Sequence, residues 1–144
     1  SGATILTGGK RLTDEEHKGG FYMAPTIIED ARPSDAISRD ELFGPITCLY
    51  RVKGFTEAVE LVNDSPFGLT AAIHTKNMHR AMTFMNEVKT GVISINGATY
   101  GSEPHMPFGG LGQSGTGWRE AGTEALDVYS DWKTVYIVHD PTDV

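Results

Sequence analysis

The sequence is poor in cysteine, in basic side chains and in long apolar runs, and each shortage excludes a class of protein. The single cysteine, Cys48, cannot form a disulfide within the chain, which favours a reducing, intracellular compartment. Twelve Lys and Arg stand against 19 Asp and Glu, a formal net charge of −7, so no nucleic-acid partner is expected. No apolar run approaches the roughly 18–20 residues of a membrane span, and residues 1–10 lack the features of a signal peptide. We therefore expect a cytoplasmic protein without a membrane partner.

The residues that are present alternate between short strands and helices. A chain of 144 residues fits one domain with a sizeable core. Short β-branched or apolar runs predict strands, and apolar residues that recur at i, i+3, i+4 and i+7 predict helices. The expected strands are 25–29, 46–52, 69–75, 92–95 and 133–138; the expected helices are 33–42 (a turn or short helix), 56–63, 78–89 and 119–129. This alternation is typical of βαβ units, so an α/β fold with a parallel sheet is expected.

Several residues within these elements have predicted structural roles. Thr56 and Asn77 stand where helix N-caps are expected, and Gly91 stands just past the end of a helix. The methionines of the third helix recur on one face, which is more often core than a binding site. They are Met78, Met82 and Met85. Cys48 lies in an apolar strand and is expected to be buried and structural rather than reactive.

Two loops are candidates for a site. Residues 96–118 are rich in Gly, Ser and Pro, have no hydrophobic period, and follow a strand, at whose carboxyl end α/β sheets bind ligands. Within this loop the segment 107–115 suits either a substrate-lining loop or an ordinary packed loop, and it lacks the spacing of a phosphate-binding loop. In the second loop, Glu41 could accept hydrogen bonds from ribose hydroxyls and Phe43 could pack against a flat heterocycle. A plain turn explains the same two residues.

Other polar residues carry weaker signals. The five histidines lack the spacing of zinc ligands, so no metal site is expected, and only His105 lies in the long loop. Glu120 begins the last predicted helix, where a carboxylate would stabilise the helix dipole.

Several motifs, taken in order, resemble the NAD(P)-dependent aldehyde dehydrogenase family. They are ELFGP at 41–45, NDSPFGLTAA at 63–72, GVISIN at 91–96, PFGG at 107–110, Ser114-Gly115, and Arg119-Glu120-x-Gly122. The resemblance covers nearly the whole chain and implies a parallel-sheet βαβ fragment from the C-terminal part of the catalytic domain. Residues 1–132 would belong to that domain, with an active-site loop at 96–118, and residues 133–144 would form a terminal oligomerisation strand and tail.

The resemblance also implies functional roles. Glu41 would bind the nicotinamide ribose of NAD or NADP, and Phe43 would lie beside the nicotinamide. Phe108 would line the site of a small-molecule aldehyde, with His105 in the same loop, and Glu120 would be the catalytic residue of a proton network. The terminal strand would join a sheet in a neighbouring subunit, so a homodimer or homotetramer is expected.

The sequence departs from the family in ways that bear on activity. The family's nucleophilic cysteine lies in a Gly-Gln-x-Cys-type stretch that is absent here, Cys48 does not match it, and the general-base glutamate is absent. Residues 1–144 alone are therefore expected to be an inactive fragment of an enzyme that oxidises an aldehyde to a carboxylic acid through a cysteine thioester. The alternative is a non-catalytic α/β binding or oligomerisation module with the same fold. The residues leave open the aldehyde, the choice between NAD and NADP, and an acid or a coenzyme A thioester as product.

Overall fold

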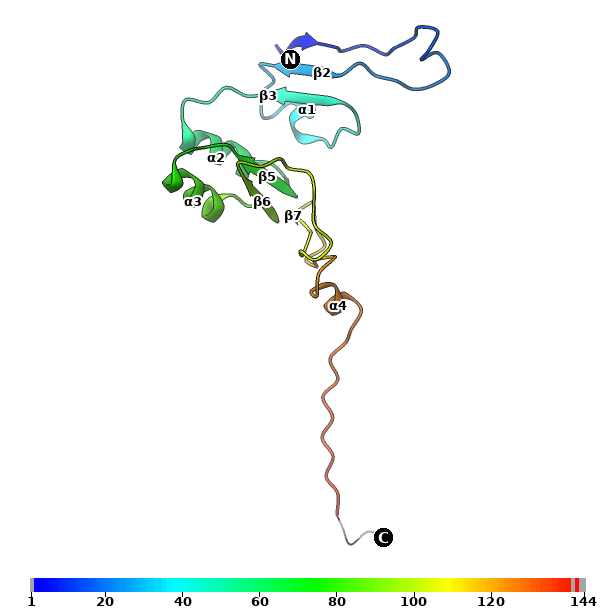
Figure 1. Cartoon of the computed structure of the whole chain (residues 1–144), viewed down its shortest axis with the longest axis vertical. Helices are drawn as coiled ribbons and strands as arrows, with labels where there is room; N and C mark the ends of the chain where they lie inside the picture. Colours follow the sequence, from blue (N-terminus) through cyan, green and yellow to red (C-terminus); the bar gives the residue numbers. More distant parts are fainter. Residues whose placement is uncertain (1, 141, 143–144) are drawn as a thin grey trace. The chain divides into compact units, whose positions relative to one another are not determined.

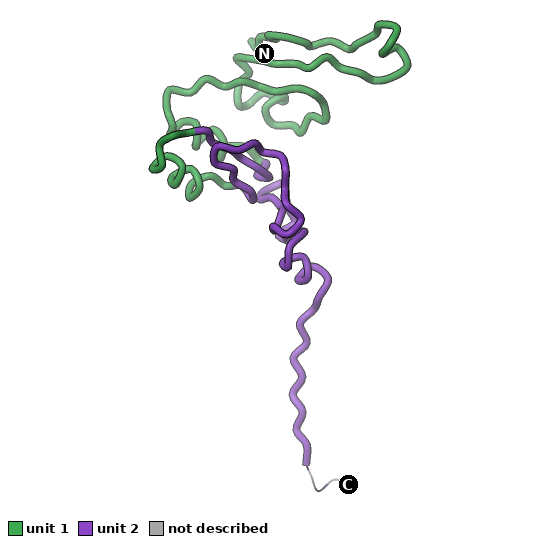
Figure 2. Tube along the Cα trace, viewed as in Figure 1, with its two compact units in different colours: residues 1–66, 75–89 green, residues 67–74, 90–144 purple. Residues whose placement is uncertain are grey.

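The computed structural model describes residues 2–140 and residue 142, which fall into two units. Unit 1 consists of residues 1–66 and 75–89, and unit 2 consists of residues 67–74 and 90–144 (Figure 2). Neither unit is one continuous stretch of chain. The predicted fold class is confirmed, because each unit contains a pair of parallel strands accompanied by helical segments.

The sheet of unit 1 has three strands, with β2 in the middle (Figure 1). β2 (Thr26–Glu29) pairs antiparallel with β1 (Thr4–Thr7) and parallel with β3 (Ile46–Leu49). Alternate residues of β2 are buried, as expected for a strand with one face toward the core. Ile28 on that buried face is the register partner of Cys48, which is free and half-buried rather than buried as predicted.

Three helices accompany this sheet in the described residues of unit 1. The short helix α1 (Ala36–Arg39) connects β2 to β3, while α2 (Phe55–Asn63) and α3 (Met78–Glu87) pack against each other (Figure 1). The predicted cap at Asn77 is confirmed, because its side chain accepts a hydrogen bond of 3.1 Å from the backbone N–H of Arg80. The predicted cap at Thr56 is wrong, because α2 begins one residue earlier, with Gly54 at the N-cap and no side-chain cap.

The buried face of α3 differs from the predicted one. Ala81 and Phe84 are buried in α3, and Val88, which follows at the C-cap, is buried as well. The three methionines are exposed instead: Met78 by 74%, Met82 by 45% and Met85 by 43%. Their prediction as core residues is therefore wrong. The methionines and the buried residues of α3 both recur with helical spacing, and among the described residues of unit 1 the buried set includes the aromatic ring of Phe84.

The residues at the starts of α2 and α3 allow a matched pair of substitutions. We expect Asn77→Ala to lower the free energy of unfolding by about 1 kcal/mol, because one N–H of the first turn loses its acceptor. Thr56→Ala should change it by less than about 0.5 kcal/mol, because the exposed Thr56 side chain caps nothing. Urea unfolding followed by circular dichroism measures both values. Equal losses in the two variants would contradict the assignment of the caps.

Unit 2 contains a second parallel pair and a small antiparallel pair. β5 (Thr70–Ile73) pairs with β6 (Val92–Ile95), so that Thr70 is opposite Val92. The connection between them passes through α3, as in a βαβ unit. β4 (Phe67–Gly68) pairs antiparallel with β7 (Leu111–Gly112), which lies within the long loop predicted at 96–118.

The strand predictions hold for 25–29 and 92–95, and the other two predicted internal strands end earlier than expected. β3 stops at Leu49 and β5 stops at Ile73. Within the described residues β3 and β5 belong to different sheets, so the single continuous parallel sheet implied by the two crossover units is not formed. Periodicity identifies strands, but it does not say which strands become neighbours.

The helix predicted at 119–129 is reduced to α4 (Ala125–Val128). Ala121 and Gly122 adopt φ angles of +62° and +67°, which a right-handed helix cannot contain. Glu120 therefore does not begin a helix, and the dipole role considered for it is wrong.

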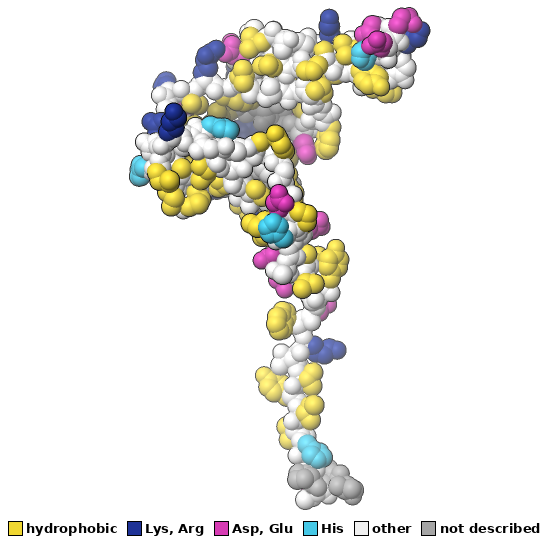
Figure 3. Space-filling model, viewed as in Figure 1, with side chains coloured by type: hydrophobic (Ala, Val, Ile, Leu, Met, Phe, Trp, Pro, Cys, Tyr) yellow, Lys and Arg dark blue, Asp and Glu magenta, His cyan; other side chains and the backbone are white. Residues whose placement is uncertain are grey.

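The strand predicted at 133–138 is not formed within the described part of the chain. These residues carry no strand pairing, and their apolar side chains are exposed, among them Tyr136 by 90% and Val138 by 97%. Figure 3 shows hydrophobic side chains spaced along this extended segment. Residues 141, 143 and 144 of the predicted tail, and Ser1 at the other end, lie outside the described residues. Among the helices that are described, none is both long and apolar enough to cross a membrane.

Candidate functional site

A backbone bridge joins two of the predicted site residues in unit 2. The N–H of Phe108 donates to the carbonyl oxygen of Glu120 at 2.8 Å, and the N–H of Glu120 donates to that of Phe108 at 2.9 Å. Residues that exchange both hydrogen bonds in an antiparallel pair carry their side chains on the same side of the backbone. Phe108 is half-buried and Glu120 is exposed. The bridge therefore presents a partly exposed aromatic ring and a solvated carboxylate together.

The turn that carries His105 is tied to the same region. The backbone N–H of Gly122 donates to the carbonyl oxygen of Pro104 at 3.0 Å, and that of Met106 donates to Glu103 at 3.0 Å. His105 is exposed on this turn. Unit 2 thus brings together three predicted site residues, His105, Phe108 and Glu120.

Close backbone packing holds the glycine-rich segment in place. A Cβ atom built on Gly91 would lie 1.7 Å from the carbonyl oxygen of Gly109, so no side chain fits at Gly91. The N–H of Gly91 also donates to the carbonyl oxygen of Gly68 at 3.0 Å. Its predicted role as a helix stop is wrong, because α3 ends at Glu87 with Val88 as its C-cap. Gly91 instead allows the segment after Phe108 to approach the start of β6.

The side chains of Arg119 and Ser114, which belong to the motifs given above, also hold the glycine-rich segment in place. Arg119 donates from Nη1 to the carbonyl oxygen of Gly110 at 3.3 Å and to that of Trp118 at 3.1 Å. Ser114 accepts a hydrogen bond of 3.2 Å from the backbone N–H of Gly68 at its Oγ. Both side chains therefore fix the loop that carries Phe108.

The loop with Glu41 and Phe43 belongs to unit 1, where it enters β3. Its backbone makes two consecutive tight turns, with Gly44 N–H donating to Leu42 at 2.9 Å and Ile46 N–H donating to Gly44 at 2.8 Å. These turns leave the Phe43 side chain 93% exposed, and Glu41 is exposed as well. The loop therefore carries an exposed carboxylate and an exposed aromatic ring, which suit the hydroxyls of a ribose and the face of a flat heterocycle.

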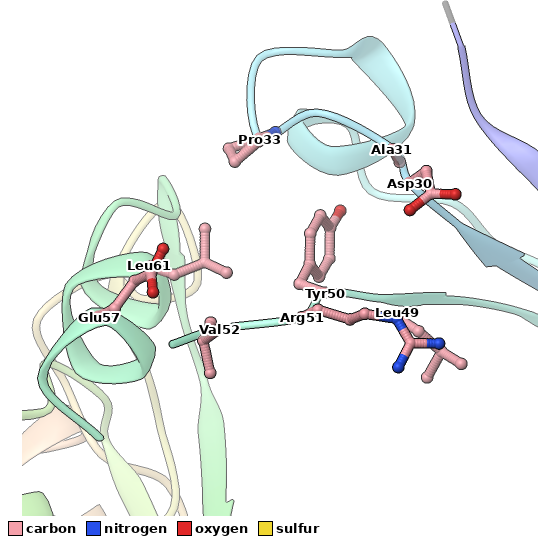
Figure 4. A pocket seen from close by; sticks show the side chains of 9 residues that line it. All are labelled: Asp30, Ala31, Pro33, Leu49, Tyr50, Arg51, Val52, Glu57 and Leu61. Carbon is pink, nitrogen blue, oxygen red and sulfur yellow. The ribbon is translucent and has the colours of Figure 1, made fainter. Parts of the chain in front are cut away.

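Sequence reasoning did not find a cleft of about 320 Å³ at the opposite end of β3 (Figure 4). The Tyr50 hydroxyl donates to Ser38 Oγ at 2.6 Å, and burial raises the pKa of Tyr50 above its ordinary value. No motif marks the cleft, because the residues that line it come from separate segments. They are Asp30, Ala31, Pro33, Leu49, Tyr50, Arg51, Val52, Glu57 and Leu61.

One group of side chains in the described residues has the composition of a metal site. The group consists of Asp14, Glu16 and His17 and lies on the connection between β1 and β2, where Figure 3 shows acidic and basic side chains at the surface. His17 Nδ1 lies 2.6 Å from Asp14 Oδ1, and this hydrogen bond holds the pKa of Asp14 below its ordinary value. The internal hydrogen bond explains the arrangement without an ion.

Comparison with known proteins identifies the family that this chain resembles. The model of the family described as "Aldehyde dehydrogenase family" matches residues 1–135. The α-ketoglutaric semialdehyde dehydrogenase of Bacillus subtilis is 37% identical over 136 residues, which are 94% of this chain and 28% of that protein. The mitochondrial aldehyde dehydrogenase of Leishmania tarentolae is 39% identical over 137 residues, which are 94% and 26% of the two chains.

A solved structure gives the same result. Betaine aldehyde dehydrogenase from Staphylococcus aureus, crystallised in complex with NAD⁺, superposes with a TM-score of 0.83 at 37% identity. The match covers 89% of this chain and 25% of that one. The chain therefore spans about a quarter of the length of the relatives it matches.

Proposed function

The chain belongs to the aldehyde dehydrogenase family, and we propose that it is the C-terminal part of the catalytic domain of an enzyme that oxidises an aldehyde to a carboxylic acid. The relatives it resembles are about four times as long. We propose that the nucleophilic cysteine and the general-base glutamate lie in the remainder of the enzyme. The family chemistry would then run through a cysteine thioester.

Residues of unit 1 would hold the cofactor. The Glu41 carboxylate is exposed and suited to accept hydrogen bonds from two vicinal hydroxyls, and the exposed ring of Phe43 is suited to pack against a flat heterocycle. NAD⁺ is the cofactor in the complex of the Staphylococcus aureus relative, which supports NAD or NADP here. When bound, the cofactor would accept the hydride that the aldehyde carbon loses.

Residues of unit 2 would line the aldehyde site. Phe108 would provide an apolar wall, His105 would lie on the adjacent turn, and Glu120 would hold or move a proton. The observation that carries this proposal is the bridge between Phe108 and Glu120, because it pairs residues of two separate family motifs. If the two motifs matched the family only by chance, there would be no reason for Phe108 and Glu120 to be paired through both backbone hydrogen bonds.

The proposal predicts that residues 1–144 alone form no NADH or NADPH from any aldehyde, whereas the full-length enzyme that contains them does. Cys48 does not supply the nucleophile, because it is half-buried opposite Ile28 in the sheet. Cofactor absorbance measures turnover, and Cys48→Ala is the matched variant. Turnover by residues 1–144 that survives Cys48→Ala would overturn the fragment interpretation. Turnover that Cys48→Ala abolishes would instead identify Cys48 as the nucleophile.

We also propose that residues 133–138 pair with a sheet of another subunit and thereby form a homodimer or homotetramer. The support is the row of exposed apolar side chains with unpaired backbone, which is a template for strand pairing. Deleting residues 134–144 should lower the number of subunits per particle, which light scattering measures over a dilution series. Deleting only 140–144 keeps the apolar row and should leave the number of subunits unchanged. An unchanged number of subunits in both deletions would contradict the role of this segment in assembly.

A further inference from the structure

The loop with Glu41 and Phe43 is not held by its own side chains. Among the residues that the structure describes, neither the Glu41 carboxylate nor the Phe43 ring makes a hydrogen bond, ion pair or ring contact. The far end of the loop is fixed where the N–H of Thr26 donates to the carbonyl oxygen of Pro45 at 2.8 Å. The direction of the loop therefore depends on what fixes its near end, which is α1.

Arg39, the last residue of α1, fixes that end. Its Nη1 donates to the carbonyl oxygen of Asp64 at 2.5 Å, and its Nη2 forms an ion pair with Asp64 Oδ2. One guanidinium thus contacts a backbone and a side-chain oxygen of the same residue, a two-point contact that a lysine cannot reproduce. Glu41 lies two residues beyond Arg39.

Asp64 is itself a fixed point. It is the C-cap of α2, and its N–H donates to the carbonyl oxygen of Glu60 at 3.0 Å. The neighbouring Asn63 side chain donates to the carbonyl oxygen of Glu87 at 2.9 Å and accepts from the N–H of Lys89 at 2.8 Å. Arg39 is therefore connected to the place where the ends of α2 and α3 are joined.

A second contact prevents α1 from turning about Arg39. Ser38 Oγ donates to the carbonyl oxygen of Arg32 at 2.7 Å and accepts from the Tyr50 hydroxyl at 2.6 Å. The helix is thus attached to the end of β3 on one side and to α2 on the other. The Arg39 and Asp64 side chains are 35% and 57% exposed, and a pair this exposed contributes little to stability. Its effect is on geometry.

We infer that Arg39 and Asp64 are positioning residues that set where the Glu41 carboxylate meets the cofactor ribose. This inference rests on the proposed function. It also gives a role to the first two residues of the NDSPFGLTAA motif, which the proposed chemistry does not use: Asn63 joins the helix ends and Asp64 receives Arg39. The ion pair acts on the cofactor only through Glu41.

The experiment is a double-mutant cycle in the full-length enzyme, with the Kd of NADH measured by fluorescence titration. Arg39→Gln should raise this Kd about fivefold in the parent enzyme and less than about twofold in a Glu41→Gln background. Asp64→Asn keeps the carbonyl acceptor and should have a smaller effect in the same direction. The matched control is Arg51→Gln, which breaks the Arg51–Glu29 ion pair at the other end of β3 and should leave the Kd unchanged. The urea midpoint of each variant is measured alongside.

Each outcome supports or overturns the inference. A raised Kd in Arg39→Gln that disappears in the Glu41→Gln background, with an unchanged urea midpoint, supports it. A raised Kd in Glu41→Gln with no change in Arg39→Gln or Asp64→Asn overturns the inference alone. Equal effects of Arg39→Gln in both backgrounds overturn it as well, because the pair would then act independently of Glu41. An unchanged Kd in Glu41→Gln overturns the cofactor-binding role proposed for Glu41, and the inference with it.

Discussion

Replacing Glu41 by Gln is expected to weaken the binding of NADH to the full-length enzyme roughly tenfold to a hundredfold. The carboxylate would accept charge-assisted hydrogen bonds from the ribose hydroxyls, each worth about 1.5–3 kcal/mol, whereas the amide oxygen is a neutral acceptor. Folding should be unaffected, because Glu41 is exposed and makes no contact among the described residues that the substitution removes. The measurements are the Kd of NADH, the KM for NAD⁺ and the urea midpoint.

The adjacent carboxylate provides the control for that result. Asp40 is also exposed, belongs to the same loop and has no role implied by the family resemblance. Asp40→Asn removes the same charge and should change the Kd of NADH by less than about twofold. Equal effects of the two substitutions would show that only the net charge of the loop matters. Glu41 would then return to the interpretation as a solvated residue of a plain turn.

Gly91→Ala is expected to lower the free energy of unfolding by about 3 kcal/mol, at the upper end of the range for overpacking. The added Cβ would lie 1.7 Å from a backbone oxygen, which cannot rotate away as a side chain could. The start of β6 and the segment after Phe108 would have to separate. Urea unfolding measures the loss, and the KM for the aldehyde in the full-length enzyme should rise with it.

A second glycine of unit 2 separates this clash from a general effect of alanine. A Cβ on Gly97 would lie 3.5 Å from Ser94 Oγ, an ordinary contact, so Gly97→Ala should change stability by less than about 0.5 kcal/mol. If Gly91→Ala were as stable as Gly97→Ala, the close approach of Gly91 to Gly109 would not exist in the folded protein.

The sequence predicts local features of this fold well when one physical cue decides them. Strand β6 and the cap at Asn77 follow directly from apolar β-branched residues and from a side chain that satisfies a free N–H. The buried face of α3 is mispredicted because two stripes have the same period, and only packing selects Phe84 over the methionines. The helix at 119–129 fails because periodicity carries no information about the positive φ of Ala121.

The candidate site is predictable in its residues but not in its arrangement. Motif order singles out Phe108 and Glu120, yet nothing in their spacing says that they face each other across a bridge. Gly91 is noticed as a helix stop, while its actual contact is with Gly109, a neighbour only in three dimensions. Arg39 and Asp64 are 25 residues apart, and their pairing likewise depends on tertiary structure.

The interleaving of the two units has a consequence for how the polypeptide is made. Residues 67–74 of unit 2 leave the ribosome before residues 75–89 of unit 1. Unit 1 cannot be completed until α3 has emerged, and by then β5 is already exposed without β6, its partner in the sheet. Contacts that span such distances along the chain form slowly, and an unpaired strand edge promotes aggregation in the interval. The rate at which residues 74–95 emerge from the ribosome should therefore influence the yield of soluble protein more than the rate at which the rest of this region emerges.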